Sequence, residues 1–213
     1  MNRHINACIG AGMLLVLAAC GSSNNNVPAP EVKVTELAAG VYAVATGDAS
    51  TPEAGKYYAA SDGSRLLVLN NSSAQASALY RREGNGSWQM TPTAKQNTTL
   101  DLLNSSAVPS TVLNVTSVAR SYMVRLSSGT AAAFTISSAG DIVAGATTCK
   151  LTGKLSTSTL PNTLKASLTA SSCGDLPAQS EGYLVADSDY APATFRLLTS
   201  SGSTLVDLWA YAE

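Results

Sequence analysis

The chain has 213 residues, of which only 13% are charged, and its formal net charge is −1. This balance provides no basic surface, so we expect no nucleic-acid partner. The chain is long enough for one domain with a substantial core or for two small ones. Apolar residues recur in short, regular runs beyond residue 31, which argues against disorder there.

Residues 1–19 have the order of a secretory signal. Arg3 and His4 precede an apolar run from Ile9 to Ala19, and small residues end that run. A basic start, a short apolar stretch and a small-residue cleavage site are the three parts of such a signal. The run is too short for a transmembrane helix, which needs about 20 residues.

The signal ends in Leu17-Ala18-Ala19-Cys20-Gly21. This motif resembles the lipobox of bacterial prolipoproteins. The resemblance implies cleavage before Cys20 and a lipid anchor built on that cysteine, with diacylglycerol on its sulfur and a further acyl chain such as palmitate on its amino group. Gly21 favours the outer membrane, on either its periplasmic or its outer surface. An ordinary signal followed by a chance cysteine is the alternative.

A short linker follows the anchor. Residues 20–31 are polar, contain proline and lack an apolar period, so we expect a flexible tether. About eleven such residues have an end-to-end distance of roughly 18 Å, which keeps the folded part near its membrane. Residues 32–213 then form a single all-β domain, with possible sub-halves at 32–140 and 141–213.

Short runs of β-forming residues, separated by Gly, Ser, Asn or Pro, dominate the rest of the chain. The predicted strands are 40–46, 56–60, 65–69, 76–82, 87–90, 111–118, 122–126, 131–136, 149–155, 164–170, 182–187, 194–199 and 204–211. A turn or two of helix is expected only near 97–105, and 101–109 could instead be a long loop.

Four tetrads join these runs as tight turns, because Gly and Asn tolerate the positive φ that hairpins require. They are 70–73, 83–86, 127–130 and 200–203. The segment 69–80 also aligns with 198–209 without a gap, which is what a duplicated meander or independent Ser-rich hairpins would produce. We therefore expect an antiparallel β-barrel or lipocalin-like meander, with a two-sheet sandwich as the second choice.

The position of each of the four cysteines indicates its role. Cys8 leaves with the signal and Cys20 is taken by the lipid, so Cys149 and Cys173 remain. In an oxidising envelope compartment these two are expected to form a disulfide. A metal pair would need further ligands and a redox motif would need a short Cys-x-x-Cys, so both alternatives are less favoured.

Aromatic residues suggest a binding face. In the run 204–211 both alternating faces carry apolar bulk, so this strand is either central or has an exposed aromatic face. Trp209 and Tyr211 lie on one of those faces, and Tyr80 and Trp88 could belong to a similar one. Packing within the core is the ordinary role of such residues, and an exposed contiguous patch would mark an interface.

Catalytic motifs are sparse. The only histidine, His4, lies in the signal, so histidine-based acid–base and nucleophile systems are excluded from the mature chain. Asp187 and Asp189 form the densest acidic cluster and are a weak Ca²⁺ candidate or, less plausibly, a glycosidase pair. Acidic residues at such a position are more often solvated turn formers. We expect no metal and no cofactor.

These observations predict a membrane-anchored envelope lipoprotein that acts as a non-enzymatic binding or interaction module. Its partner would be an unidentified envelope protein or surface ligand. Two alternatives remain open. The domain could carry a small apolar ligand in a barrel lumen, or it could inhibit an envelope hydrolase as an immunity protein.

Overall fold

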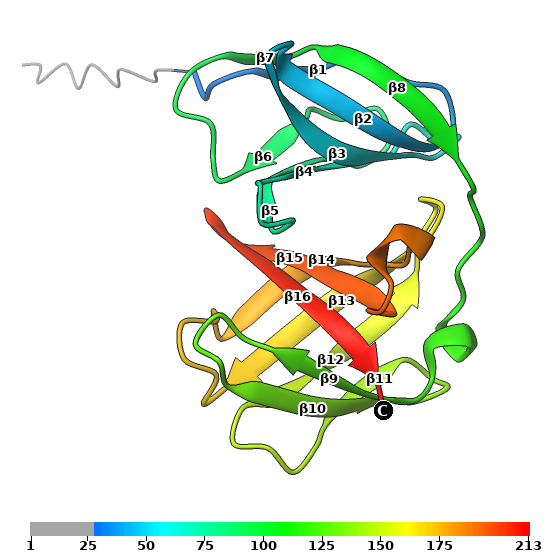
Figure 1. The fold of residues 1–213 in the computed structure, drawn as a ribbon, viewed down its shortest axis with the longest axis vertical. Helices are drawn as coiled ribbons and strands as arrows, with labels where there is room; N and C mark the ends of the chain where they lie inside the picture. The colour runs from blue at the N-terminus through cyan, green and yellow to red at the C-terminus, as the bar shows by residue number, and fades with distance from the viewer. Residues whose placement is uncertain (1–27) are drawn as a thin grey trace, which may run out of the picture.

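The computed structural model describes residues 28–213, so the signal, Cys20 and most of the tether lie outside the described part. This part is all-β, as predicted, and within it there are two short 3₁₀ helices and no α-helix. An open six-stranded sheet is followed by a closed eight-stranded barrel (Figure 1). No helix in residues 28–213 is long and apolar enough to cross a membrane.

The sheet unit contains the first eight strands. Their bounds are β1 (Val32–Val34), β2 (Gly40–Asp48), β3 (Thr51–Ala59), β4 (Arg65–Asn70), β5 (Ala76–Arg82), β6 (Gln89–Thr91), β7 (Thr98–Leu100) and β8 (Leu102–Val108). The sheet order is β6-β5-β4-β3-β2-β8, and β1 pairs with β7 as a separate two-stranded ribbon. The ribbon residues Val32 and Val34 pack with Tyr57 and Leu67 on one face of the sheet.

The barrel is a simple meander of the last eight strands. Their bounds are β9 (Ser121–Arg125), β10 (Ala131–Ile136), β11 (Asp141–Ala144), β12 (Lys150–Thr157), β13 (Thr163–Ser171), β14 (Gln179–Val185), β15 (Phe195–Ser201) and β16 (Thr204–Ala212). Each strand pairs with the next one antiparallel, and β16 closes the barrel onto β9. This confirms the predicted antiparallel barrel.

The interior of the barrel is a packed core. One side chain in two along each strand points inward, and these residues form one continuous buried cluster. At its centre Tyr122 stacks on Phe134 and meets Phe195 edge to face, with ring centroids 5.8 and 4.6 Å apart. An eight-stranded barrel is just wide enough for side chains to fill it, which is what these residues do.

The second face of the sheet packs on the outside of the barrel. Tyr58, Leu66 and Val68 from the sheet share one buried cluster with Tyr183 and Leu198 from the barrel. Both faces of β4 are therefore covered, and four of its six residues, 66–69, are buried apolar side chains. A strand buried on both faces reads as a continuous apolar run instead of an alternating one.

The change from sheet to barrel falls between Val108 and Ser121, whereas residue 140 lies in the turn between β10 and β11. The connecting segment holds a 3₁₀ helix, η1 (Val115–Val118), capped by Asn114. The prediction of a strand over 111–118 is wrong, because this segment bonds to the buried Asn162 and not to a neighbouring strand: Asn162 Oδ1 accepts from Thr111 N at 2.6 Å.

Four strands were not predicted. Three of them, β1, β7 and β11, have only three or four residues. The fourth, β8, replaces the helix or loop expected over 97–109, because pairing with β2 outweighs its weak local β signal. The predicted turns all join hairpins or neighbouring strands, and the two similar segments 69–80 and 198–209 fall on the β4–β5 and β15–β16 hairpins.

Candidate functional site: a groove along the barrel seam

Asp187 and Asp189 lie at the contact between the sheet and the barrel. Asp187 caps the second 3₁₀ helix, η2 (Ser188–Tyr190), by accepting from Asp189 N at 3.0 Å. The ammonium of Lys56 from β3 lies 3.1 Å from the Asp187 carboxylate and 2.7 Å from that of Asp189. Burial lowers the pKa of Lys56, but the two carboxylates outweigh it and raise that pKa.

The Ca²⁺ interpretation of these aspartates is therefore corrected. A Ca²⁺ ion needs six to eight oxygen ligands, and the lysine ammonium occupies the position between the two carboxylates. Within residues 28–213 no group of three or more potential metal ligands is present. The ion pairs between Lys56 and the two aspartates join the sheet to the barrel and have a structural role.

A second polar contact between the sheet and the barrel is made by Arg196. Arg196 on β15 is 1% exposed and donates to both carboxylate oxygens of Asp207 on β16, at 3.0 and 2.6 Å. It also donates to Asn70 Oδ1 at the end of β4, at 3.1 Å. Its guanidinium lies 4.5 Å from the Trp209 ring and 5.3 Å from the Tyr190 ring. The ion pair and the cation–π contacts hold the guanidinium in place on the barrel, and its bond to Asn70 links the β4–β5 hairpin to β15.

The four aromatic residues singled out from the sequence do not form one patch. Tyr80 is buried in the sheet at 3% exposure, so the expectation that it belongs to a surface face is corrected. Trp88 lies at the far edge of the sheet against Arg82 and Tyr57. Trp209 is half-buried against Tyr190. Of the four, only Tyr211 is largely exposed, at 42%.

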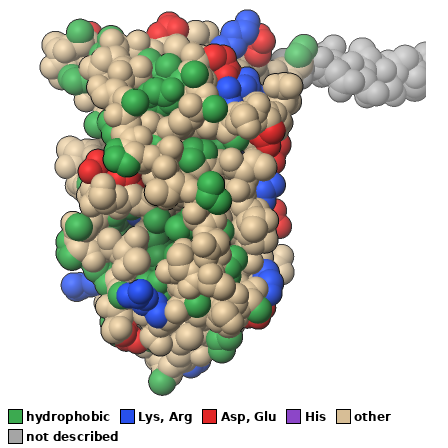
Figure 2. Space-filling model, turned by 90° about the vertical axis from the view of Figure 1, so that its right-hand side faces the viewer, with side chains coloured by type: hydrophobic (Ala, Val, Ile, Leu, Met, Phe, Trp, Pro, Cys, Tyr) green, Lys and Arg blue, Asp and Glu red, His purple; other side chains and the backbone are tan. Residues whose placement is uncertain are grey.

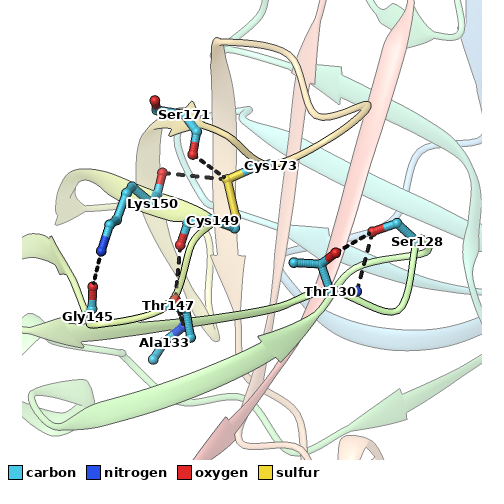
Figure 3. The surroundings of a disulfide bond; sticks show 9 residues. All are labelled: Ser128, Thr130, Ala133, Gly145, Thr147, Cys149, Lys150, Ser171 and Cys173. Atoms are coloured by element: carbon cyan, nitrogen blue, oxygen red, sulfur yellow. Dashed lines mark hydrogen bonds between the residues drawn. A yellow bond between two sulfur atoms is a disulfide. The ribbon is translucent and has the colours of Figure 1, made fainter.

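Cys149 and Cys173 form a disulfide at the open end of the β12–β13 hairpin, with Cα atoms 4.5 Å apart. Figure 3 shows this bond beside the β9–β10 turn that carries Ser128 and Thr130. Beyond Cys173 the chain forms the β13–β14 loop, where Leu176 N donates to Cys173 O. The disulfide therefore anchors this loop next to the end of β9.

The barrel seam is paired along only part of its length. The register between β9 and β16 contains three residue pairs, from Ala210 with Val124 to Ala212 with Tyr122. β16 has nine residues but β9 has five, since β9 ends at Arg125 and the chain turns back into β10. The first half of β16 therefore pairs with β15 alone.

A groove of about 700 Å³ lies where the seam is open. Its walls come from β16, the end of β9, the β4–β5 turn and the β13–β14 loop. The lining residues are Ser73, Gln75, Ala76, Arg125, Leu126, Ser127, Leu176, Leu205, Val206, Asp207, Leu208, Trp209 and Tyr211. We call this the seam groove. A second hollow of about 240 Å³ shares its Leu126, Ser127, Leu176, Leu205 and Val206 and extends to Cys173 and Pro177.

The seam groove combines apolar walls with one available cation. Leu176 and Leu205 are half-buried and Tyr211 is exposed, so apolar surface is open to solvent there. Asp207 is engaged by Arg196 and by the backbone N–H of Ala76 at 2.7 Å. Arg125 is exposed, and no ion pair within residues 28–213 involves it. The groove can therefore bind apolar groups next to an anion.

Of the residues proposed from the sequence, Trp209 and Tyr211 line this groove, whereas Arg125, Leu176 and Leu205 were missed. The difference in length between the strands predicted at 122–126 and 204–211 was the only signal. It became informative only once these two strands were known to be neighbours.

No protein-family model, curated protein or solved structure matches the sequence.

Proposed function

We propose that this protein is a bacterial envelope lipoprotein whose folded part is a non-enzymatic binding module. The observation that carries the proposal is the seam groove, a concave and partly apolar surface beside an open strand edge. Ligand sites are typically such concave, mainly apolar surfaces with a few polar groups. The lipobox-like motif ending at Cys20 supports the anchoring part of the proposal.

The anchor and the tether suit a module that works close to a membrane. Two or three acyl chains give stable attachment where a single chain gives only marginal binding. A tether of roughly 18 Å would keep the groove within reach of other components of the same membrane. Figure 2 shows mostly neutral surface on the face it presents, with charged side chains scattered singly or in small groups. Recognition on such a surface would depend on shape and apolar contact.

A carrier role in the barrel lumen is less favoured. The inward side chains of all eight strands form a single core, and the aromatic cluster of Tyr122, Phe134 and Phe195 occupies its centre. A small barrel either fills with side chains or holds one ligand. An inhibitor or immunity protein would use a surface such as the seam groove, so it is a special case of the proposed binding module.

Affinity capture with the full-length lipidated protein from envelopes of its host tests the proposal. Tyr211→Asp places a charge on the exposed rim of the seam groove, and Val143→Asp places the same charge on the outer face of β11, where Val143 is 55% exposed. Wild type and Val143→Asp should retain a stoichiometric partner that Tyr211→Asp loses. Equal recovery by all three proteins, or no partner for wild type, would contradict the proposal.

A further inference from the structure

The open half of the seam leaves backbone groups of β16 without a strand partner. Backbone groups alternate in direction along a strand. Glu213 N donates to Ser121 O across the seam, at 3.2 Å. Counting back by two places the N–H and C=O groups of Tyr211, Trp209, Asp207 and Leu205 on this seam side. The register of β9 with β16 covers Tyr211 and, because Ala210 and Val124 form a non-hydrogen-bonded pair, also the C=O of Trp209. The N–H of Trp209 and both groups of Asp207 and Leu205 have no partner in β9.

The hairpin at the other end of β16 gives the same result independently. Ser201 pairs with Thr204 across a two-residue turn, and Val206 and Leu208 pair with Thr199 and Leu197. The closing pair of a two-residue hairpin exchanges backbone bonds, so every second residue from Thr204 faces β15. Leu205, Asp207 and Trp209 must then face the seam.

Such an edge is unusual in a closed barrel, where closure normally removes free edges. The residues that protect an exposed edge, lysine and proline, are absent from β16. The unpaired groups face a groove that is large enough to hold another chain, instead of open solvent.

The walls of the seam groove suit an extended chain. Val206, Leu208 and Leu126 belong to the barrel core and also line the groove, so one side of an inserted strand would meet the core. Leu205 and Tyr211 lie on the outer side. Because strand side chains alternate between faces, the ligand would have apolar residues that point toward the core at every second position.

Two structural features hold the groove open in advance. The disulfide fixes the loop that carries Leu176, and backbone bonds from Asn71 N to Gln75 O and from Ala74 N to Asn71 O stiffen the β4–β5 turn. Preformed walls reduce the entropy lost on binding. Arg125 at the end of β9 adds an exposed cation at one side of this path.

We propose that the seam groove accepts an extended polypeptide segment of a partner protein, which adds as a strand to β16 at Leu205–Trp209 and places a carboxylate near Arg125. Main-chain bonds to the free edge would supply affinity, and the alternating apolar positions would supply specificity. This inference rests on the proposed binding function and specifies the chemistry of its ligand.

Hydrogen exchange on the free protein tests the edge without any ligand. The amide protons of Leu205, Asp207 and Trp209 should exchange at least tenfold faster than those of Val206 and Leu208, which bond to β15. Equal protection of both sets would show that the edge is already satisfied and would overturn the strand-addition proposal, while leaving the proposed binding function intact.

A random peptide display library, selected on the full-length protein in detergent, tests the ligand class. The selected peptides should carry alternating apolar residues and an acidic group, and N-methylation of their backbone should lower affinity more than tenfold. Their binding should protect the amides of Leu205 and Trp209. Helical binders, binding that tolerates N-methylation, a second copy of this chain as the only ligand, or no selected peptide would overturn the proposal.

Two variants and a control complete the test. Leu205→Pro removes a seam-side donor without disturbing the β15 ladder, since proline is tolerated where its position faces away from a paired strand. Arg125→Glu should shift selection from acidic to basic peptides. Val143→Asp should bind as wild type does. Thermal unfolding of each variant verifies the fold, and a folded Leu205→Pro protein that still binds the peptides would contradict strand addition.

Discussion

Replacing Arg196 by methionine should uncouple the β4–β5 hairpin from the barrel. Arg196 is 1% exposed and its partner Asp207 has a side chain that is 8% exposed, so the substitution leaves a buried carboxylate without its cation. Removing one member of a buried ion pair typically costs about 3–5 kcal/mol. The lost bond to Asn70 and the lost contact with the Trp209 ring act in the same direction.

The double variant Arg196→Met/Asp207→Asn separates the charge effect from the packing effect. Asparagine keeps an acceptor for Ala76 N and removes the orphaned charge, so the double variant should be less destabilised than the sum of the single variants, with a coupling energy of about 1–3 kcal/mol. Urea unfolding, followed by the fluorescence of Trp209 in a Trp88→Phe background, measures each free energy. A cost below about 1 kcal/mol for Arg196→Met, as for a surface pair, would refute the reasoning.

Three further predictions concern the covalent and titratable groups. Replacing both Cys149 and Cys173 by serine should lower the free energy of unfolding by about 3 kcal/mol, from a loop of 25 residues in the chain-entropy model; reactive thiols in the unreduced wild type would contradict the bridge. Burial raises the pKa of Tyr58 well above its ordinary value, and burial likewise raises the pKa of Tyr190. The folded chain therefore keeps protons that the unfolded chain loses near pH 10, so the urea midpoint should fall as the pH rises above about 10, and less steeply in Tyr58→Phe; an unchanged midpoint would contradict this. Cys20→Ser should abolish incorporation of labelled fatty acid and release the protein from membranes, and continued labelling would exclude the lipobox interpretation.

Local sequence was a good guide to the hairpins. The strands at Ala76–Arg82 and Ala131–Ile136 begin and end where they were predicted, because each is a run of β-formers bounded by turn residues. The β15–β16 turn is equally local, since Gly202 there adopts a φ of +57° that glycine allows without strain. Interactions between sequence neighbours determine such features.

Features that depend on distant pairing were missed. The strand β8 contains Asn104 and two serines, and only the edge of β2 makes it a strand. The two faces of β16 were recognised as apolar, but whether the outer one was covered could not be known from the sequence. The structure shows that the β4–β5 hairpin covers Asp207 and that Trp209 packs on Tyr190, while Tyr211 stays exposed.

The sequence by itself determined the all-β class, the hairpin turns and the one disulfide, since each follows from residue type and spacing. Tertiary structure alone decided that Lys56 lies between Asp187 and Asp189, and that the sheet and the barrel share one buried cluster. It also decided that β16 extends beyond the end of its partner strand β9. The two strands lie about 80 residues apart in the sequence, and they become neighbours only when the whole barrel closes. The difference in their lengths therefore could not be interpreted from the local sequence.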